Sequence, residues 1–140
     1  MKTIFVWHFH HKGLVEPLVG GLAAIRYRQG GIRRNKPKGE QETRLTLFKV
    51  VQGKLPLALV KAGTAYDKAR AVCAQAGAVC HQTGAVYAPA RAVCAQDRDD
   101  CVQARAAYAQ ALKAHLPEIE ALHAKECPNC PWDGSSIFPK

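Results

Sequence analysis

The middle of the chain is dominated by a seven-residue pattern of apolar and small residues. Tyrosine or cysteine stands at every seventh position in one series: Tyr66, Cys73, Cys80, Tyr87, Cys94, Cys101 and Tyr108. A second series, three residues further along each heptad, is mostly alanine: Ala69, Ala76, Thr83, Ala90, Asp97, Ala104 and Ala111. Two such positions per heptad form a seam along one side of an α-helix. The chain is therefore expected to be mainly α, with a coiled-coil-like rod over residues 56–116, built as one long helix or as a helical hairpin.

A longer repeat lies over the heptads. Residues 66–86 align without gaps with residues 87–107, and both copies contain the sequence Ala-Arg-Ala-Val-Cys-Ala-Gln. Self-similarity at a fixed period is typical of a repeated structural unit. The alignment therefore indicates a tandem duplication of three heptads.

Two arrangements of the rod fit this pattern. A single helix over residues 66–115 would be about 75 Å long at about 1.5 Å per residue, and would need a partner chain to cover its seam. Alternatively, the chain folds back near Gly84 to Pro89, where Pro89 removes a backbone donor. A turn about Tyr87 would pair Cys80 with Cys94, Cys73 with Cys101, and Tyr66 with Tyr108. We favour the hairpin or a kinked form, and we expect a homo-oligomer or a partner helix at the seam.

The first 55 residues predict a small α+β head. Residues 3–9 are rich in β-branched and aromatic types and predict a strand, as do residues 44–51. Residues 12–28 have apolar positions spaced for one face of a helix. Residues 32–39 predict a polar, basic loop.

Positive charge is concentrated at the N-terminal end. Residues 1–61 hold twelve Lys or Arg against three Glu, whereas residues 62–140 hold eight of each sign. Six of these basic residues gather around two glycines: Arg26, Arg28, Arg33, Arg34, Lys36 and Lys38. Lys and Arg in such clusters neutralise phosphates, which predicts docking on nucleic acid, with Tyr27 available to stack on a base. A solvated basic loop is the alternative. We do not expect membrane binding, because the cations follow the apolar run rather than lining one face.

The C-terminal segment, residues 117–140, contains the one motif with recognised chemical spacing. We expect a short helix followed by Cys127-Pro-Asn-Cys130. Two cysteines separated by two residues can chelate zinc, and His123 adds a third ligand. The fourth would be His115 or a residue of a second chain. We favour a turn without metal over zinc, so no cofactor is certain from the sequence and zinc is one possibility. A thiol-redox pair is the least favoured interpretation, because no helix follows the first cysteine as redox chemistry prefers.

Three histidines near the N-terminus raise a second metal hypothesis. His8 and His10 would share one face of the predicted strand, and His11 the other. A metal pair is one interpretation of this spacing. We favour histidines on an exposed strand edge, since no third ligand lies nearby in the sequence.

The remaining features bear on compartment and class. The N-terminus lacks a clean signal-cleavage site. The four seam cysteines are expected to be free, buried thiols, which suits a reducing compartment. We therefore expect a cytoplasmic protein, or a virion-associated one if a phage encodes it. No catalytic motif is present, and we predict a non-enzymatic helical assembly protein whose basic head docks on nucleic acid. A purely structural interaction module and a small zinc or thiol protein are the alternatives.

Overall fold

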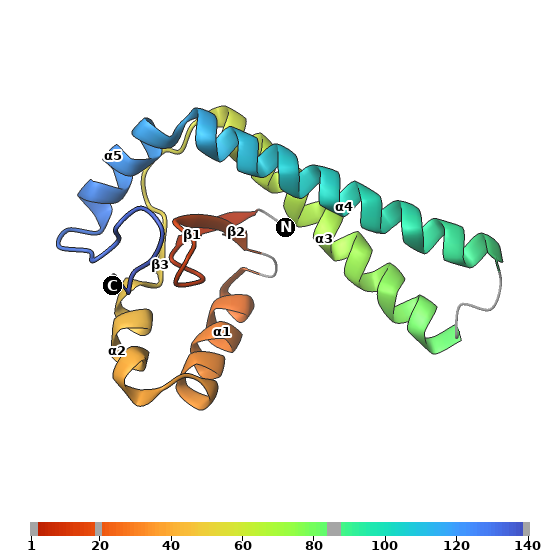
Figure 1. The fold of residues 1–140 in the computed structure, drawn as a ribbon, viewed down its shortest axis with the longest axis horizontal. Helices are drawn as coiled ribbons and strands as arrows, with labels where there is room; N and C mark the ends of the chain where they lie inside the picture. Colours follow the sequence, from red (N-terminus) through yellow and green to blue (C-terminus); the bar gives the residue numbers. More distant parts are fainter. Residues whose placement is uncertain (1–2, 19–20, 84–87, 139–140) are drawn as a thin grey trace. The chain divides into compact units, whose positions relative to one another are not determined.

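The computed structural model describes residues 3–18, 21–83 and 88–138. These residues form five helices and a small antiparallel sheet (Figure 1). The prediction of a mainly helical chain with an N-terminal α+β part is thereby confirmed. None of the helices in the described ranges is long and apolar enough to cross a membrane.

Two compact units make up the fold. Unit 1 comprises residues 1–55 and 117–140, and unit 2 comprises residues 56–116. The C-terminal segment thus belongs to the same unit as the N-terminal head. A ligand set drawn from both ends of the chain is therefore available within unit 1.

The sheet of unit 1 has the strand order β2-β1-β3. β1 (Ile4–Trp7) pairs antiparallel with β2 (Val15–Leu18) and with β3 (Lys49–Val50). In the central strand β1, Ile4 is half-buried and the next three residues are buried, with Val6 and Trp7 both 0% exposed. Pro17 lies in β2, which is an edge strand, where a missing backbone N–H is tolerated.

Three local predictions for the head were wrong. Residues 12–28 do not form one helix, because Pro17 disfavours helical backbone at the residue before it and the chain continues as β2. α1 (Gly21–Asn35) begins only at Gly21, whose φ is 57°. The expected loop over 32–39 is largely the end of α1 and the start of α2 (Lys38–Leu47), and the expected strand over 44–51 is reduced to β3. Good helix formers such as Gln41 and Glu42 outweigh the short apolar alternation that follows them.

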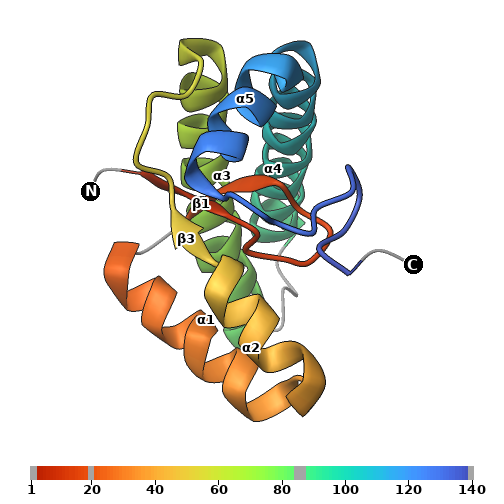
Figure 2. The same cartoon turned by 90° about the vertical axis from the view of Figure 1, so that its left-hand side faces the viewer.

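Two apolar clusters contribute to the core of unit 1. One combines Val6, Leu18 and Phe48 from the sheet region with Ile25 of α1. The other joins Leu47 of α2 to the C-terminal segment through these residues: Cys127, Cys130, Trp132, Ile137 and Phe138. The backbone N–H of Ile137 also donates to the carbonyl of His11, at 2.9 Å. The segment after α5 (Leu116–Glu126) is therefore packed on the head, while α1 and α2 form a short helix pair (Figure 2).

Unit 2 is a pair of antiparallel helices, α3 (Leu57–Thr83) and α4 (Ala88–Ala114), which lie side by side (Figure 1). The rings of Tyr66 and Tyr108 are 6.0 Å apart, and Cys80 is joined to Cys94 by a disulfide with a Cα–Cα distance of 6.9 Å. The prediction of a single continuous helix is therefore wrong, because the described residues form two separate helices. Tyr87, about which the turn was expected, lies outside the described residues. Regular coiled-coil packing stays a prediction.

The disulfide corrects the expectation that all four seam cysteines are free thiols. Cys80 and Cys94 are bonded, whereas Cys73 and Cys101 are free. The heptad pattern predicts that these cysteines lie on one side of a helix. It does not predict whether two facing sulfurs form a disulfide.

Candidate metal centre

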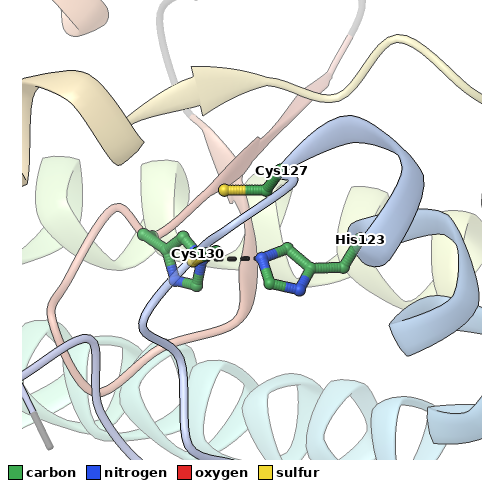
Figure 3. Close-up of side chains that lie close together, drawn as sticks. His123, Cys127 and Cys130 are labelled. Carbon is green, nitrogen blue, oxygen red and sulfur yellow. Dashed lines mark hydrogen bonds between the residues drawn. The ribbon is translucent and has the colours of Figure 1, made fainter.

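Four side chains of unit 1 converge on one point: His8, His123, Cys127 and Cys130. Their ligand atoms all lie within 4.8 Å of one another. The Nε2 atoms of His8 and His123 are 2.9 Å apart, and the Cys130 sulfur is 3.3 Å from Nε2 of His8. Figure 3 shows His123, Cys127 and Cys130 directed toward a common centre. No second group of this kind is found among residues 3–18, 21–83 and 88–138.

The end of α5 positions three of the four ligands. The N–H of Cys127 donates to the carbonyl of His123 at 2.7 Å, so both side chains leave the same side of the last turn. A tight turn follows, in which the N–H of Cys130 donates to the carbonyl of Cys127 at 3.3 Å. Asn129 adopts φ 62° in this turn, a conformation that asparagine tolerates better than most residues. The turn brings the second sulfur back beside the first.

His8 reaches the site from the other end of the chain. β1 ends at Trp7, and His8 turns out of the strand with φ 54°. Its backbone N–H donates to the carbonyl of Leu14 at 3.0 Å, and its Nδ1 lies 3.0 Å from the carbonyl of Gly13. Since a carbonyl only accepts, Nδ1 carries the proton and the lone pair of Nε2 faces the cluster. Metal-binding histidines are commonly oriented by such a bond from their second nitrogen.

Aromatic rings enclose the two histidines. The Trp7 ring is 5.1 Å from that of His123, and the Trp132 ring is 5.3 Å from that of His8. His8 and His123 are only 3% and 7% exposed. The four polar ligands thus lie in a largely water-free environment, where uncompensated polar atoms are costly.

Burial shifts the protonation of the ligands. Desolvation lowers the pKa of His8 to about 4, with the Gly13 hydrogen bond opposing and the charge of His123 reinforcing this shift. Desolvation likewise lowers the pKa of His123. Both imidazoles are therefore neutral near pH 7, which is the state that binds a metal. Burial, followed by interactions with Cys130, raises the pKa of Cys127 to about 11.

Glu126 anchors the end of α5 to the head. Its carboxylate accepts hydrogen bonds from the Trp7 indole at 3.1 Å, the Gln52 N–H at 2.8 Å and the Gly53 N–H at 2.6 Å. Burial alone would raise the pKa of Glu126, but these hydrogen bonds outweigh it and lower the pKa below its ordinary value. The carboxylate therefore fixes the helix turn that carries His123 and Cys127.

The donor set and its spacing fit zinc. Zn–N distances of about 2.0–2.1 Å and Zn–S distances of about 2.3 Å place tetrahedral ligand atoms about 3.3–3.8 Å apart. The Nε2 atoms at 2.9 Å would separate by about 0.4 Å to match this geometry. Ligand atoms that are up to 4.8 Å apart would approach one another by up to about 1 Å.

The structure brings together the three ligands predicted from the sequence, His123, Cys127 and Cys130, and adds His8 as the fourth. The fourth position was expected from His115 or a second chain, but His115 belongs to unit 2. The exposed-edge interpretation is wrong for His8, which is buried. His10 is exposed as expected and pairs with Glu16 at 3.0 Å, but it lies beyond the end of β1 and not on a strand edge. His8 and His10 do not share a strand face, because β1 ends before both.

The predicted nucleic-acid residues lie on helices rather than in a loop. Arg26, Arg33 and Arg34 are exposed on α1, and Lys38 is exposed at the start of α2. Lys36, between the two helices, is half-buried. Arg28 is half-buried as well, donates to the Phe9 carbonyl at 3.3 Å and stacks over the Phe9 ring. Desolvation lowers the pKa of Arg28. Arg28 thus contributes to packing of the head.

No family model, curated protein or solved structure matched the chain.

Proposed function

We propose that this protein binds one structural zinc ion through His8, His123, Cys127 and Cys130. The convergence of these four ligand atoms within 4.8 Å carries the proposal. The zinc would link the N-terminal β-hairpin, through His8, to the end of α5, through His123. These two ligands are 115 positions apart in the chain. A unit of this size has a limited apolar core, and metal binding commonly supplies the missing stability.

The chemistry of the ligands favours zinc over other cations. Two sulfurs and two imidazole nitrogens in a tetrahedral arrangement are typical of zinc, whereas magnesium and calcium prefer oxygen ligands. The cation would take the place of the two thiol protons and so overcome the raised pKa of Cys127. Four protein ligands fill the tetrahedron, which is the pattern of a structural rather than a catalytic zinc site.

Thiol-redox chemistry at the same cysteines fits the geometry less well. A reactive Cys-x-x-Cys thiolate is favoured at a helix N-terminus, whereas Cys127 directly follows the C-terminal end of α5. The negative end of the helix dipole there disfavours a thiolate that has no cation. The raised pKa of Cys127 points the same way.

The proposal is tested by the zinc content of the full chain. We expect about one zinc per chain by elemental analysis after gel filtration, as the four-ligand site implies. The Cys127→Ser/Cys130→Ser variant should lose this zinc. The Cys73→Ser/Cys101→Ser variant also removes two free cysteines and should keep it. Less than about one zinc per two chains of the unmodified protein, with the ligand set of four intact, would refute the proposal.

We propose, as a second function, that exposed cations of α1 and α2 dock on nucleic acid, with the protein acting as a non-enzymatic assembly factor. The supporting observation is that Arg26, Arg33, Arg34 and Lys38 are exposed and form no ion pair with any described residue. Tyr27 is 79% exposed beside them, as base stacking requires. The α3–α4 pair would supply a surface for self-association or for a partner helix.

A further inference from the structure

The helix pair of unit 2 contains two layers of facing cysteines. Cys80 and Cys94 form one layer and are bonded, while Cys73 and Cys101 are free thiols one heptad away. We infer that Cys73 and Cys101 are the site of a second interhelical disulfide, closed by exchange with a small-molecule disulfide such as oxidised glutathione. The inference is independent of the zinc site, which lies in unit 1.

The register of the two helices places Cys73 opposite Cys101. One heptad back along α3 from Cys80 is Cys73, and one heptad forward along α4 from Cys94 is Cys101. The next heptad reaches Tyr66 and Tyr108, whose rings are 6.0 Å apart. The Cys73–Cys101 layer thus lies between two observed interhelical contacts. Antiparallel helices of equal rise keep their register over so short a distance.

The tandem duplication makes the two cysteine layers equivalent. Residues 66–86 correspond to residues 87–107, so Cys73 corresponds to Cys94 and Cys80 to Cys101. Two copies packed antiparallel are related by an approximate two-fold axis between them. That axis exchanges the pair Cys80–Cys94 with the pair Cys101–Cys73. The helix approach that allows one disulfide is therefore expected at the other.

The surroundings of Cys101 agree with this placement. Burial, and then the charge and hydrogen bond of Cys73, raise the pKa of Cys101, while Arg70 and Arg105 act in the opposite direction. The two thiols are thus near enough to interact directly. Both residues are half-buried, so a small oxidant can reach the sulfurs.

Closure takes place in two exchange steps. A thiolate of the pair attacks oxidised glutathione, forms a mixed disulfide and releases one glutathione thiolate. The other cysteine thiolate then attacks the protein sulfur of the mixed disulfide and releases the second glutathione. The two cysteines lose two protons and two electrons, and one glutathione disulfide becomes two thiols.

Tryptic mapping under non-reducing conditions resolves the bonds. Cleavage at Arg70, Arg91 and Arg98 leaves Cys73 and Cys80 on peptide 71–91, Cys94 on peptide 92–98 and Cys101 on peptide 99–105. After incubation of the full chain with oxidised glutathione and blocking of free thiols, we expect one species that joins all three peptides. Cys127 and Cys130 are the only cysteines of peptide 126–140, so a disulfide formed by these proposed zinc ligands is detected separately.

Two matched variants decide the register. Cys80→Ser/Cys94→Ser leaves the facing pair Cys73 and Cys101, and should link peptides 71–91 and 99–105. Cys80→Ser/Cys101→Ser leaves Cys73 and Cys94, which are displaced by one heptad, about 10.5 Å along the helix. We expect at least tenfold less intramolecular link in this second variant. Equal closure of both variants, or closure of neither, would overturn the inference, as would an oxidised unmodified chain in which peptide 99–105 stays unlinked.

Discussion

The Nε2 atoms of His8 and His123 lie 2.9 Å apart in the buried centre of unit 1, although the two residues are 115 positions apart in the sequence. Because Nδ1 of His8 is directed at the Gly13 carbonyl, Nε2 of His8 accepts and Nε2–H of His123 donates when no cation is bound. A cation at this point would replace that shared proton and receive both nitrogen lone pairs. If the proposed zinc binds, folding of the head and metal binding would be coupled at this contact.

The first prediction concerns His8 itself. His8→Ala should weaken zinc binding by at least about 100-fold, because it removes a ligand rather than an orienting partner, whose loss costs about 10–100-fold. Competition with a chromophoric chelator measures the affinity. His10→Ala is the matched control, since His10 is exposed and outside the cluster. Unchanged affinity in His8→Ala, or equal loss in both variants, would contradict the assignment.

The second prediction is a pH dependence of the metal-free protein. The pKa of His8 is lowered from 6.5 to about 4 in the folded state, mainly by burial. Between these values the unfolded chain binds more protons than the folded chain, so the free energy of unfolding should fall as pH drops from 6.5 to about 4. Urea unfolding of chelator-treated protein, followed by tryptophan fluorescence, measures this in unit 1, where Trp7 and Trp132 both lie.

The histidine origin of this slope can be checked with His8→Ala, which should show a shallower fall over the same range. The pKa of His123 is lowered in the same direction, so part of the slope should persist in that variant. A free energy of unfolding that is constant or rises on acidification across this window would contradict the burial of neutral imidazoles.

The third prediction concerns Glu126. Glu126→Gln places an amide N–H₂ against backbone donors, because Gln52 and Gly53 donate to different oxygens of the carboxylate. We expect unit 1 to lose about 1–3 kcal/mol of unfolding free energy, the usual cost of an unsatisfied or charge-assisted hydrogen bond. Glu120→Gln on the exposed side of α5 should change stability by less than about 0.5 kcal/mol. Similar losses in both variants would show that general charge, not these bonds, is responsible.

The parts of the fold that the sequence predicted correctly are those with a regular repeat. The seven-residue repeat fixes which side of a helix faces its partner, and the pairs expected for a fold-back, Cys80 with Cys94 and Tyr66 with Tyr108, are in contact. The head has no comparable period. There, short apolar runs fit a helix or a strand equally well, and Pro17 and the helix formers of α2 decided the outcome.

The candidate site was predictable only where its ligands are close in sequence. His123, Cys127 and Cys130 lie within one helix turn and one tight turn, so their spacing alone indicates a shared site. His8 joins them through the packing of β1 against α5, which includes the Trp7–Glu126 hydrogen bond. No local pattern encodes that contact. The spacing of His8, His10 and His11 instead favoured histidines on an exposed strand edge. In the structure β1 ends at Trp7, His8 is buried and His10 is exposed outside the strand.

The last prediction tests the basic surface of the head. Neutralising phosphates releases counterions, so the logarithm of the binding constant falls with the logarithm of salt concentration by about 0.9 per phosphate contact on duplex DNA. Replacing four exposed cations by alanine should weaken binding to labelled DNA at low salt and reduce the slope by up to about 3.6. The four substitutions are Arg26→Ala, Arg33→Ala, Arg34→Ala and Lys38→Ala.

A variant with equal loss of charge in unit 2 separates local docking from general attraction. It replaces four exposed cations of α3 and α4 with alanine: Lys61, Lys68, Arg91 and Lys113. If the head docks on nucleic acid, this control keeps the slope of the unmodified protein, because net charge alone acts weakly beyond a Debye length of about 10 Å at about 0.1 M salt. Equal loss of DNA affinity in the two variants would show that binding is a nonspecific attraction to the net charge of the protein. Absence of binding by the unmodified chain at low salt would refute the nucleic-acid proposal.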